Sequence, residues 1–278
     1  MVPIVNGVVG TVQTVPASGG TLSGVACYNA TSCVAVGLLS RQGLVVPITN
    51  GVAGTPQLIA SIRSGLTAVS CYSATACVAV GSTRVFPQPA TGVEVLITNG
   101  TGGAAQAVPG TTNLTAIACR VSVCEATGVL TSGQPGVVPF VDGVPGTPQA
   151  ASATISGLAG IACPTDTLCE AVGNAPGGDT GIGAVVPVLS GTPADPVLVP
   201  GTNQLLGIAC PTAVTCIAVG SNSEVVNSTT VFQGVVVNIS IVTRTVTGDF
   251  TGPLTVNAGE SVVITNARVV GPVTVNPG

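Results

Sequence analysis

The sequence predicts an all-β protein built from repeated units, on three observations. A pair of cysteines recurs five times along the 278 residues, and these pairs account for all ten cysteines. Each pair is followed by an Ala-x-Gly ending, as in Val34-Ala35-Val36-Gly37 and Glu170-Ala171-Val172-Gly173. The chain also has 38 glycines and 21 prolines among abundant valine and threonine, a composition typical of short strands joined by tight turns. Because the first cysteines lie 44 to 48 residues apart, the repeat indicates supersecondary units.

The first hairpin of each unit contains the cysteine pair. In residues 66–81, small and apolar residues alternate on both sides of a short turn, which is the period of a half-buried strand. Cysteines at opposite strand ends of a hairpin lie close enough for a disulfide. Zinc sites usually include histidine, which this chain lacks, and redox pairs usually have Cys-x-x-Cys spacing. We therefore predict five structural disulfides and no metal site: Cys27–Cys33, Cys71–Cys77, Cys119–Cys124, Cys163–Cys169 and Cys210–Cys216.

The second hairpin of each unit turns at an Asn-Gly dipeptide. Residues 43–49 lead into Asn50-Gly51, and the chain returns through residues 55–59. Asn-Gly favours a two-residue hairpin turn because both positions need positive φ. The corner recurs as Asn6-Gly7, Asn99-Gly100, Asp142-Gly143 and, more weakly, Ser190-Gly191. Two hairpins in a unit of about 46 residues give four strands, which is the length and strand count of a β-propeller blade.

One short motif resembles a known family. The run from Ile161 to Gly173, Ile-Ala-Cys-Pro-Thr-Asp-Thr-Leu-Cys-Glu-Ala-Val-Gly, resembles the cysteine-containing propeller repeats of secreted actinobacterial proteins. Those repeats are distantly similar to sialidase-type and photosystem-assembly-factor propellers. The resemblance covers residues 1–247 and implies a β-propeller of five to six four-stranded blades, with one disulfide in each complete blade. Sialidase-like blades often carry a Ser-x-Asp-x-Gly-x-x-Trp box, whereas this chain has Asn-Gly-type turns there and no tryptophan, which argues against sialidase activity.

The two ends of the chain leave the number of blades open. Counting gives five cysteine hairpins and six hairpins of the second type, so residues 2–15 form an unpaired half-blade. A C-terminal strand that completes this half-blade would close six blades, and the alternatives are five blades with a stray hairpin or an open array. Residues 248–278 change character, because Gly252-Pro253-Leu254-Thr255-Val256-Asn257 returns nineteen residues later as Gly271-Pro272-Val273-Thr274-Val275-Asn276. We expect this segment either to close the propeller or to form the first coil of a β-helix-like stalk.

The sequence offers few residues for catalysis. The chain has no histidine and no lysine, which excludes Ser-His-Asp triads and Schiff bases. Glu125 and Glu170 occupy the same repeat position in adjacent blades, so they either face one site near the axis or stand at exposed strand positions where side-chain type matters little. Tyr28 and Tyr72 follow the first cysteine of their repeats and either stack on sugar rings or cover the disulfides. These four residues are our speculative ligand-binding residues, and we predict no catalytic residue, no cofactor and no enzyme activity.

Composition indicates the compartment and limits the partners. The six arginines stand singly and the net charge is −4, which leaves no basic surface for nucleic acid. No apolar run reaches the roughly 18 residues of a membrane span, so we predict no membrane insertion. Ten regularly paired cysteines indicate an oxidising compartment, and we expect an extracellular or cell-surface location although no signal peptide precedes Met1.

These observations favour a non-catalytic extracellular β-propeller module for adhesion or ligand binding, with a glycan or a surface protein as its partner. The first alternative is a structural subunit of a self-assembling surface layer, sheath or filament, because few charges oppose self-association. The second alternative is a sialidase-like enzyme that acts on glycans.

Overall fold

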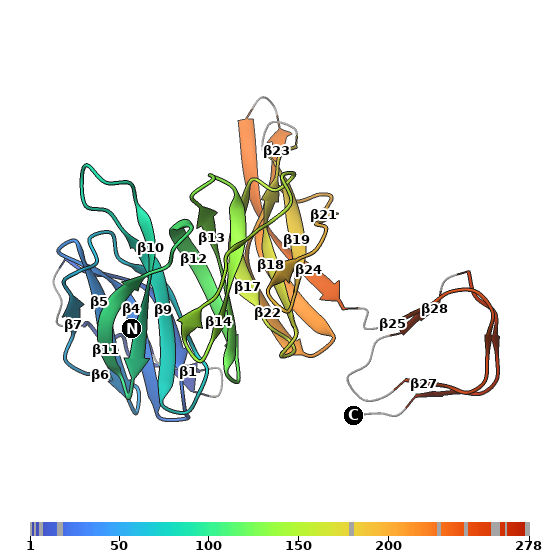
Figure 1. The fold of residues 1–278 in the computed structure, drawn as a ribbon, viewed down its shortest axis with the longest axis horizontal. Helices are drawn as coiled ribbons and strands as arrows, with labels where there is room; N and C mark the ends of the chain where they lie inside the picture. Colours follow the sequence, from blue (N-terminus) through green and yellow to red (C-terminus); the bar gives the residue numbers. More distant parts are fainter. Residues whose placement is uncertain are drawn as a thin grey trace.

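The computed structural model describes residues 2, 4–5, 8–15, 19–177, 181–226, 229–241, 244–256, 262–264 and 266–275. As predicted, strands are the regular elements of these residues, and none of them lies in a helix. Five antiparallel sheets follow one another along the chain, and we term them blades 1 to 5. Figure 1 shows the blades in a row, from blue at the N-terminal end to orange.

Within each blade, strands that are neighbours in sequence pair with one another. Blade 1 contains β3 (Thr21–Cys27), β4 (Ser32–Leu39), β5 (Gln42–Thr49), β6 (Val52–Ala53) and β7 (Gln57–Ile59). Blade 2 contains β8 (Leu66–Cys71), β9 (Ala76–Thr83), β10 (Thr91–Thr98) and β11 (Thr101–Ala107). Blade 3 contains β12 (Thr111–Arg120), β13 (Val123–Leu130), β14 (Pro135–Val141), β15 (Val144–Pro145) and β16 (Gln149–Ala150). Blade 4 contains β17 (Gly157–Ala162), β18 (Leu168–Ala175), β19 (Ile182–Leu189), β20 (Thr192–Pro193) and β21 (Val197–Val199). Blade 5 contains β22 (Gln204–Thr212), β23 (Thr215–Val226) and β24 (Thr229–Ser240).

The outer strand of blades 1, 3 and 4 is split into two short pieces that both pair with the third strand. Proline stands in each gap, at Pro56, Pro148 and Pro196. Proline cannot donate a ladder hydrogen bond, so it is tolerated at a sheet edge and interrupts the pairing there. The expectation that prolines of the second hairpins lie on outer strands is confirmed for these three and is wrong for Pro47, Pro139 and Pro187, which lie on third strands that pair on both sides.

All five predicted disulfides are present, and they join the first and second strand of each blade. Cys27 faces Cys33 directly across the ladder, and Cys119 faces Cys124 in the same way. The Cα atoms of the five pairs are 3.8 to 3.9 Å apart, closer than the about 4.5 Å of the nearer kind of opposed pair on antiparallel strands. The cysteines are therefore structural clips at the tips of the hairpins.

Removing one clip is expected to destabilise the protein moderately. In the variant with Cys119→Ser and Cys124→Ser, the lost loop closure should lower the free energy of unfolding by about 2 kcal/mol, as measured by urea denaturation. Thr167→Ser, an exposed conservative change at the next hairpin tip, serves as the control and should leave the midpoint unchanged. An unchanged midpoint in the double variant would contradict the stabilising role of the disulfide.

A bulge in the first strand of every blade explains the glycine of the Ala-x-Gly ending. In blade 3 the register shifts between Leu114 and Ala116, and the bulged strand passes close over Gly128. A Cβ atom at Gly128 would lie 2.1 Å from the carbonyl oxygen of Asn113. The corresponding distances in the other four blades are 1.9 to 2.3 Å, at the equivalent glycines Gly37, Gly81, Gly173 and Gly220. Only glycine permits this approach, so the repeat retains it.

Consecutive blades pack face to face, and we term these interfaces seams 1/2, 2/3, 3/4 and 4/5. In seam 1/2, Val34 and Val36 of the second strand pack with Leu66 and Val69 of the next blade. The other seams repeat this pattern with the equivalent residues of blades 2 to 5. The hydroxyl of Thr67 donates a hydrogen bond of 2.7 Å to the carbonyl oxygen of Leu114 across seam 2/3. The cores of the protein therefore lie between the sheets.

The chain ends do not complete a sixth blade in the described residues. Strand β1 (Ile4–Val5) pairs with β2 (Val8–Val9), and this pair joins no strand from the C-terminal end. The described residues therefore show no closed six-bladed ring and form a row of five blades with an additional N-terminal hairpin. The corner predicted at Asn6-Gly7 lies outside the described residues.

The C-terminal segment pairs with itself in parallel. The pairs are β25 (Arg244–Val246) with β28 (Val262–Ile264), β26 (Phe250–Thr251) with β29 (Val269–Val270), and β27 (Leu254–Val256) with β30 (Val273–Val275). Leu254 is opposite Val273, so the offset equals the nineteen-residue sequence repeat. Figure 1 shows these strands as a coil beyond blade 5. Parallel pairing at a fixed offset is the geometry of a β-helix coil and differs from that of a closing hairpin.

Candidate functional site

In blades 1 to 4 the turns of both hairpins meet at the end of the blade that contains the disulfide, which we term the disulfide end. In blade 1 the backbone N–H of Asn50, in the second turn, donates a hydrogen bond of 2.7 Å to the carbonyl oxygen of Thr31, in the cysteine turn. The same bond joins Asn99 to Thr75 in blade 2, and equivalent bonds join the two turns in blades 3 and 4. In blade 5, which has three strands, the N–H of Ile241 after the third strand donates to the carbonyl oxygen of Val214 in the cysteine turn. In blades 1 to 4 a disulfide and this hydrogen bond together hold the two turns side by side.

The Asn-Gly corners have the predicted turn geometry. Asn50 and Gly51 have φ values of 51° and 75°, and the corners at Asn99, Asp142 and Ser190 follow the same pattern. Positive φ at both central residues defines the type I′ turn. The corner at Ser190-Gly191, which the sequence indicated only weakly, adopts this turn as well.

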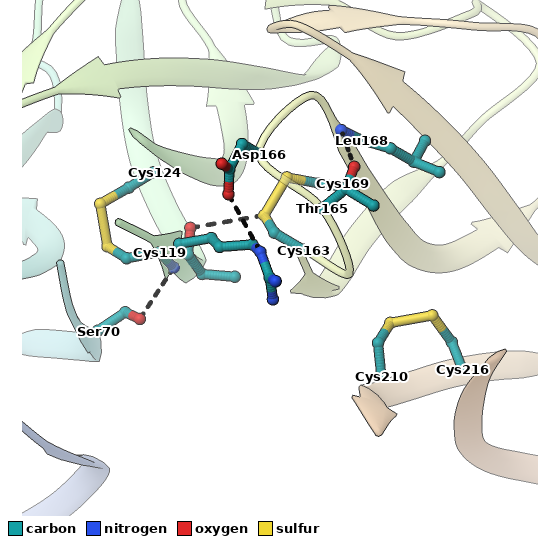
Figure 2. The surroundings of a disulfide bond; sticks show 12 residues. Ser70, Cys119, Cys124, Cys163, Thr165, Asp166, Leu168, Cys169, Cys210 and Cys216 are labelled. Atoms are coloured by element: carbon teal, nitrogen blue, oxygen red, sulfur yellow. Dashed lines mark hydrogen bonds and ion pairs between the residues drawn. A yellow bond between two sulfur atoms is a disulfide. The ribbon is translucent and has the colours of Figure 1, made fainter. Parts of the chain in front are cut away.

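Hydrogen bonds and an ion pair connect the disulfide ends of neighbouring blades (Figure 2). The backbone N–H of Cys119 donates to the hydroxyl of Ser70 at 3.0 Å, across seam 2/3. The Arg120 guanidinium lies 3.1 Å from the Asp166 carboxylate, across seam 3/4. Both side chains of this ion pair are exposed, so the pair contributes little stability and mainly neutralises the charge of the surface.

The two candidate tyrosines lie at seams. Tyr28 is half-buried against the core of seam 1/2, and Tyr72 is half-buried against the core of seam 2/3. The Tyr72 hydroxyl lies 3.2 Å from the place where a Cβ atom at Gly143, in the next blade, would stand. Burial raises the pKa of Tyr72, and the nearby carboxylates of Asp142 and Glu94 raise it further. Both rings therefore pack between blades, which leaves only part of each ring for a ligand.

Glu125 and Glu170 lie inside two different seams. They are 3% and 4% exposed, so the expectation of exposed strand positions is wrong. Glu125 contributes to seam 3/4, where its carboxylate lies beside the Ser190-Gly191 turn of blade 4. Glu170 lies on the same strand face as Val172, which packs in seam 4/5. The two side chains occupy equivalent positions, but the blades do not bring them together at one site.

Glu94 is a third buried glutamate, which the sequence reasoning missed. It is 4% exposed and lies on β10, opposite Val80. Because Val80 packs in seam 2/3, Glu94 faces that seam. The equivalent positions in blades 1, 3 and 4 are valines, namely Val45, Val137 and Val185. Aligning the third strands of the repeats would have identified Glu94 as the exception.

Each of these three carboxyl groups is buried with one oxygen unpaired. The Oε2 atoms of Glu94, Glu125 and Glu170 have no hydrogen-bond partner in the structure. Burial raises the pKa of each group to about 7. A carboxylate without a compensating donor is unstable in an apolar seam, so the protonated form is favoured there. Seams 2/3, 3/4 and 4/5 therefore each contain one group that titrates near neutral pH.

The acidic residues of the described chain do not gather at one place. No group of three or more cysteine, aspartate or glutamate side chains that could hold a metal ion occurs among them. Glycoside hydrolysis generally requires two carboxyl groups that flank one bond, and Glu125 and Glu170 lie in separate seams. The part of the chain that the structure describes also contains no helix long and apolar enough to cross a membrane.

Comparison with solved structures identifies the fold. The chain superposes on Kuenenia stuttgartiensis hydrazine synthase with a TM-score of 0.57 at 10% identity, covering 86% of this chain and 66% of that one. It superposes on the WD40 β-propeller domain of Doa1 with a TM-score of 0.51 at 11% identity, covering 73% of this chain and 62% of that one. The blades are those of a β-propeller. Its repeating four-stranded sheets and their clips are therefore the propeller architecture expected from the repeat.

The two comparisons by sequence, with family models and with curated proteins, found no match to the propeller. The chain also spans less than two thirds of the hydrazine synthase chain and of the Doa1 domain. At such low identity these structures establish the fold of this propeller and nothing about its ligands.

Proposed function

We propose that this propeller is a non-catalytic extracellular module that binds a ligand at its disulfide end. The observation that carries the proposal is the row of clipped turns, which presents one preorganised surface across all five blades. In blades 1 to 4 each turn pair is held by a disulfide and by a backbone hydrogen bond. Loops held in this way lose little conformational freedom when a ligand binds, so they suit recognition.

The exposed chemistry of this surface favours an uncharged, hydroxyl-rich ligand. Exposed residues of the cysteine turns in blades 1, 2 and 4 include small, hydroxyl and amide side chains: Asn29, Ala30, Thr31, Ser73, Ala74, Thr75 and Thr167. Three exposed valines, Val52, Val121 and Val144, add apolar patches to the same end. Arg120 and Asp166 neutralise one another there. Recognition of an anionic sugar or a phosphate would need unpaired arginines. We therefore expect a neutral glycan as the ligand.

The extracellular location is supported by the same disulfides. Five disulfides close all ten cysteines, and disulfides persist in oxidising compartments. The absence of enzyme activity is supported by the chain's lack of histidine and lysine and by the separation of the buried glutamates into different seams.

A glycan microarray that includes neutral and sialylated glycans tests the proposal. The wild-type protein is expected to bind neutral glycans, and Ala30→Arg and Ala74→Arg, two exposed changes at the disulfide end, should abolish binding. Gln88→Arg, an exposed change at the opposite end of blade 2, is the matched control and should bind normally. Binding that survives both tip variants would contradict the assignment of the surface. Release of sugar by the wild type that is lost in Glu125→Gln would show an enzyme instead.

A second function, as a structural subunit of a surface layer, sheath or filament, is favoured by one specific observation. The outward face of blade 5 and the first-strand part of the outward face of blade 1 are apolar and exposed. Such faces are suited to join one copy to another, because a sheet face without a partner is a ready interface.

A further inference from the structure

In blades 2 to 4, both faces of the sheet pack in seams. Blades 1 and 5 each have one face that has no neighbouring blade. We term the side of a blade that faces the preceding blade its upstream face and the other side its downstream face. Blade 1 has no preceding blade in the described structure, and blade 5 has no following one. On the upstream face of blade 1, Val15 of the N-terminal segment packs against the buried cluster that contains Leu44 and Val46. The first-strand part of this face, around Leu22 and Val25, and the downstream face of blade 5, around Ile217 and Val219, are exposed.

The exposure of the downstream face of blade 5 is large. Val219 is 48% exposed and Ile217 is 39% exposed. At the same two repeat positions in blades 1 to 4, every side chain is at most 4% exposed. Leu206 of blade 5 is 52% exposed and occupies the bulge position where Thr67 of blade 2 bonds to the next blade. The downstream face of blade 5 is thus a complete half-seam of apolar side chains.

The upstream face of blade 1 is the complementary half. Val25 is 64% exposed, whereas Val69 and Ile117 at the same position in blades 2 and 3 are 7% and 8% exposed. Leu22 is 38% exposed, and its counterpart Leu66 is 1% exposed.

A groove follows this upstream face. Its volume is about 790 Å³, and it is lined mainly by strand residues of blade 1, including Leu22, Val25, Ala35 and Ile48. In the seams the first strand of each blade packs against the first strand of the preceding blade, as β8 packs against β3 in seam 1/2. The groove lies along β3, which has no preceding blade in the described structure.

We propose that the occupant is a second copy of this chain, whose blade 5 places its downstream face on the upstream face of blade 1. The contact would repeat the first-strand part of an interface that the chain already makes four times with itself, beside the area where Val15 packs. The side chains named on the two faces are uncharged, so none of them opposes the contact. Joining two different faces of identical subunits is a heterologous contact, which produces rings or filaments.

This inference deepens the second proposed function, the structural subunit, and does not depend on glycan binding. The test uses analytical ultracentrifugation of the full chain from micromolar to millimolar concentration. The wild type is expected to form oligomers whose mass increases with concentration. Val25→Glu blocks the upstream face and Val219→Glu blocks the downstream face, so each variant alone should be a monomer.

Mixing the two variants gives the decisive measurement. A Val25→Glu copy retains its downstream face and a Val219→Glu copy retains its upstream face, so an equimolar mixture should form a dimer and no larger species. Val144→Glu, at an apolar position of the disulfide end that is 64% exposed, is the control and should assemble like the wild type. Circular dichroism and denaturation establish that all three variants fold.

Two outcomes would overturn the inference. A wild-type chain that remains monomeric at every concentration would show that the terminal faces are covered by the chain itself or bind something else. Oligomers of Val25→Glu alone would show that the contact joins two like faces. Ala30 lines the groove as well as the disulfide end, so the glycan-binding proposal is separated from this one by Ala74→Arg, which lies in blade 2 outside the groove.

Discussion

Gly128→Ala is expected to destabilise the protein by about 4 kcal/mol or more, the range of the most severe single substitutions. The new methyl group would lie 2.1 Å from the carbonyl oxygen of Asn113 and 2.9 Å from Leu114 Cδ2. The first contact is with backbone, so it is relieved only by moving the bulged strand out of seam 3/4. Urea denaturation of the purified variant measures the loss.

Gly234→Ala is the matched control for this experiment. Gly234 also lies within a strand, but no atom approaches the position of its Cβ within 4 Å. Its replacement should change stability by less than about 1 kcal/mol. If Gly128→Ala has the same urea midpoint as the wild type, β12 does not approach Gly128 as closely as described.

Stability is expected to fall as the pH rises from about 5 to about 8, because three buried glutamates must then ionise. The pKa of each rises from 4.5 in the unfolded chain to about 7 in the fold. Between these values the folded state binds more protons than the unfolded state, so the free energy of unfolding decreases with pH. The stabilisation is fully present below pH 4.5 and is lost as the pH passes through 7. After allowance for solvent screening, each glutamate should account for about 1 to 2 kcal/mol.

Glutamine variants isolate this effect. The triple variant with Glu94→Gln, Glu125→Gln and Glu170→Gln should be more stable than the wild type at pH 8, and its stability should be nearly constant between pH 5 and 8. Asp195→Asn, at an exposed carboxylate, is the control and should retain the wild-type slope. A triple variant that also keeps the wild-type slope would show that the pH dependence arises elsewhere.

The sequence predicted the local structure of the repeat well, because short-range chemistry determines it. The Cys27–Cys33 pairing and the turn at Asn50-Gly51 both depend on residues within one hairpin, and both are confirmed. The Ala-x-Gly ending was recognised as a motif in the sequence, but the structural requirement for its glycine was not. The clash at Gly128 arises from a bulge in the preceding strand, and a bulge has no signature in the alternation of side chains.

The placement of the candidate site residues could not be predicted in the same way. Alternation shows that a strand has two faces, but it does not show whether the second face meets water or another sheet. Glu125 was therefore expected at the surface, although blade 4 covers it. The same limit applies to closure of the ring, because it depends on the angle accumulated over five blades and on the pairing of the C-terminal strands with one another.

Each blade packs against its immediate neighbours in the row. The molecule is therefore a linear chain of coupled units. Blade 3 is held on both sides, by the Thr67 hydroxyl bond from blade 2 and by the Thr115 hydroxyl bond to Leu158 of blade 4. Blade 5 is held on one side only. In such a chain, each unit is stabilised by its contacts with its neighbours. Local opening therefore starts at the end units, which have one neighbouring unit instead of two. Local unfolding should thus begin at the terminal blades and reach blade 3 last.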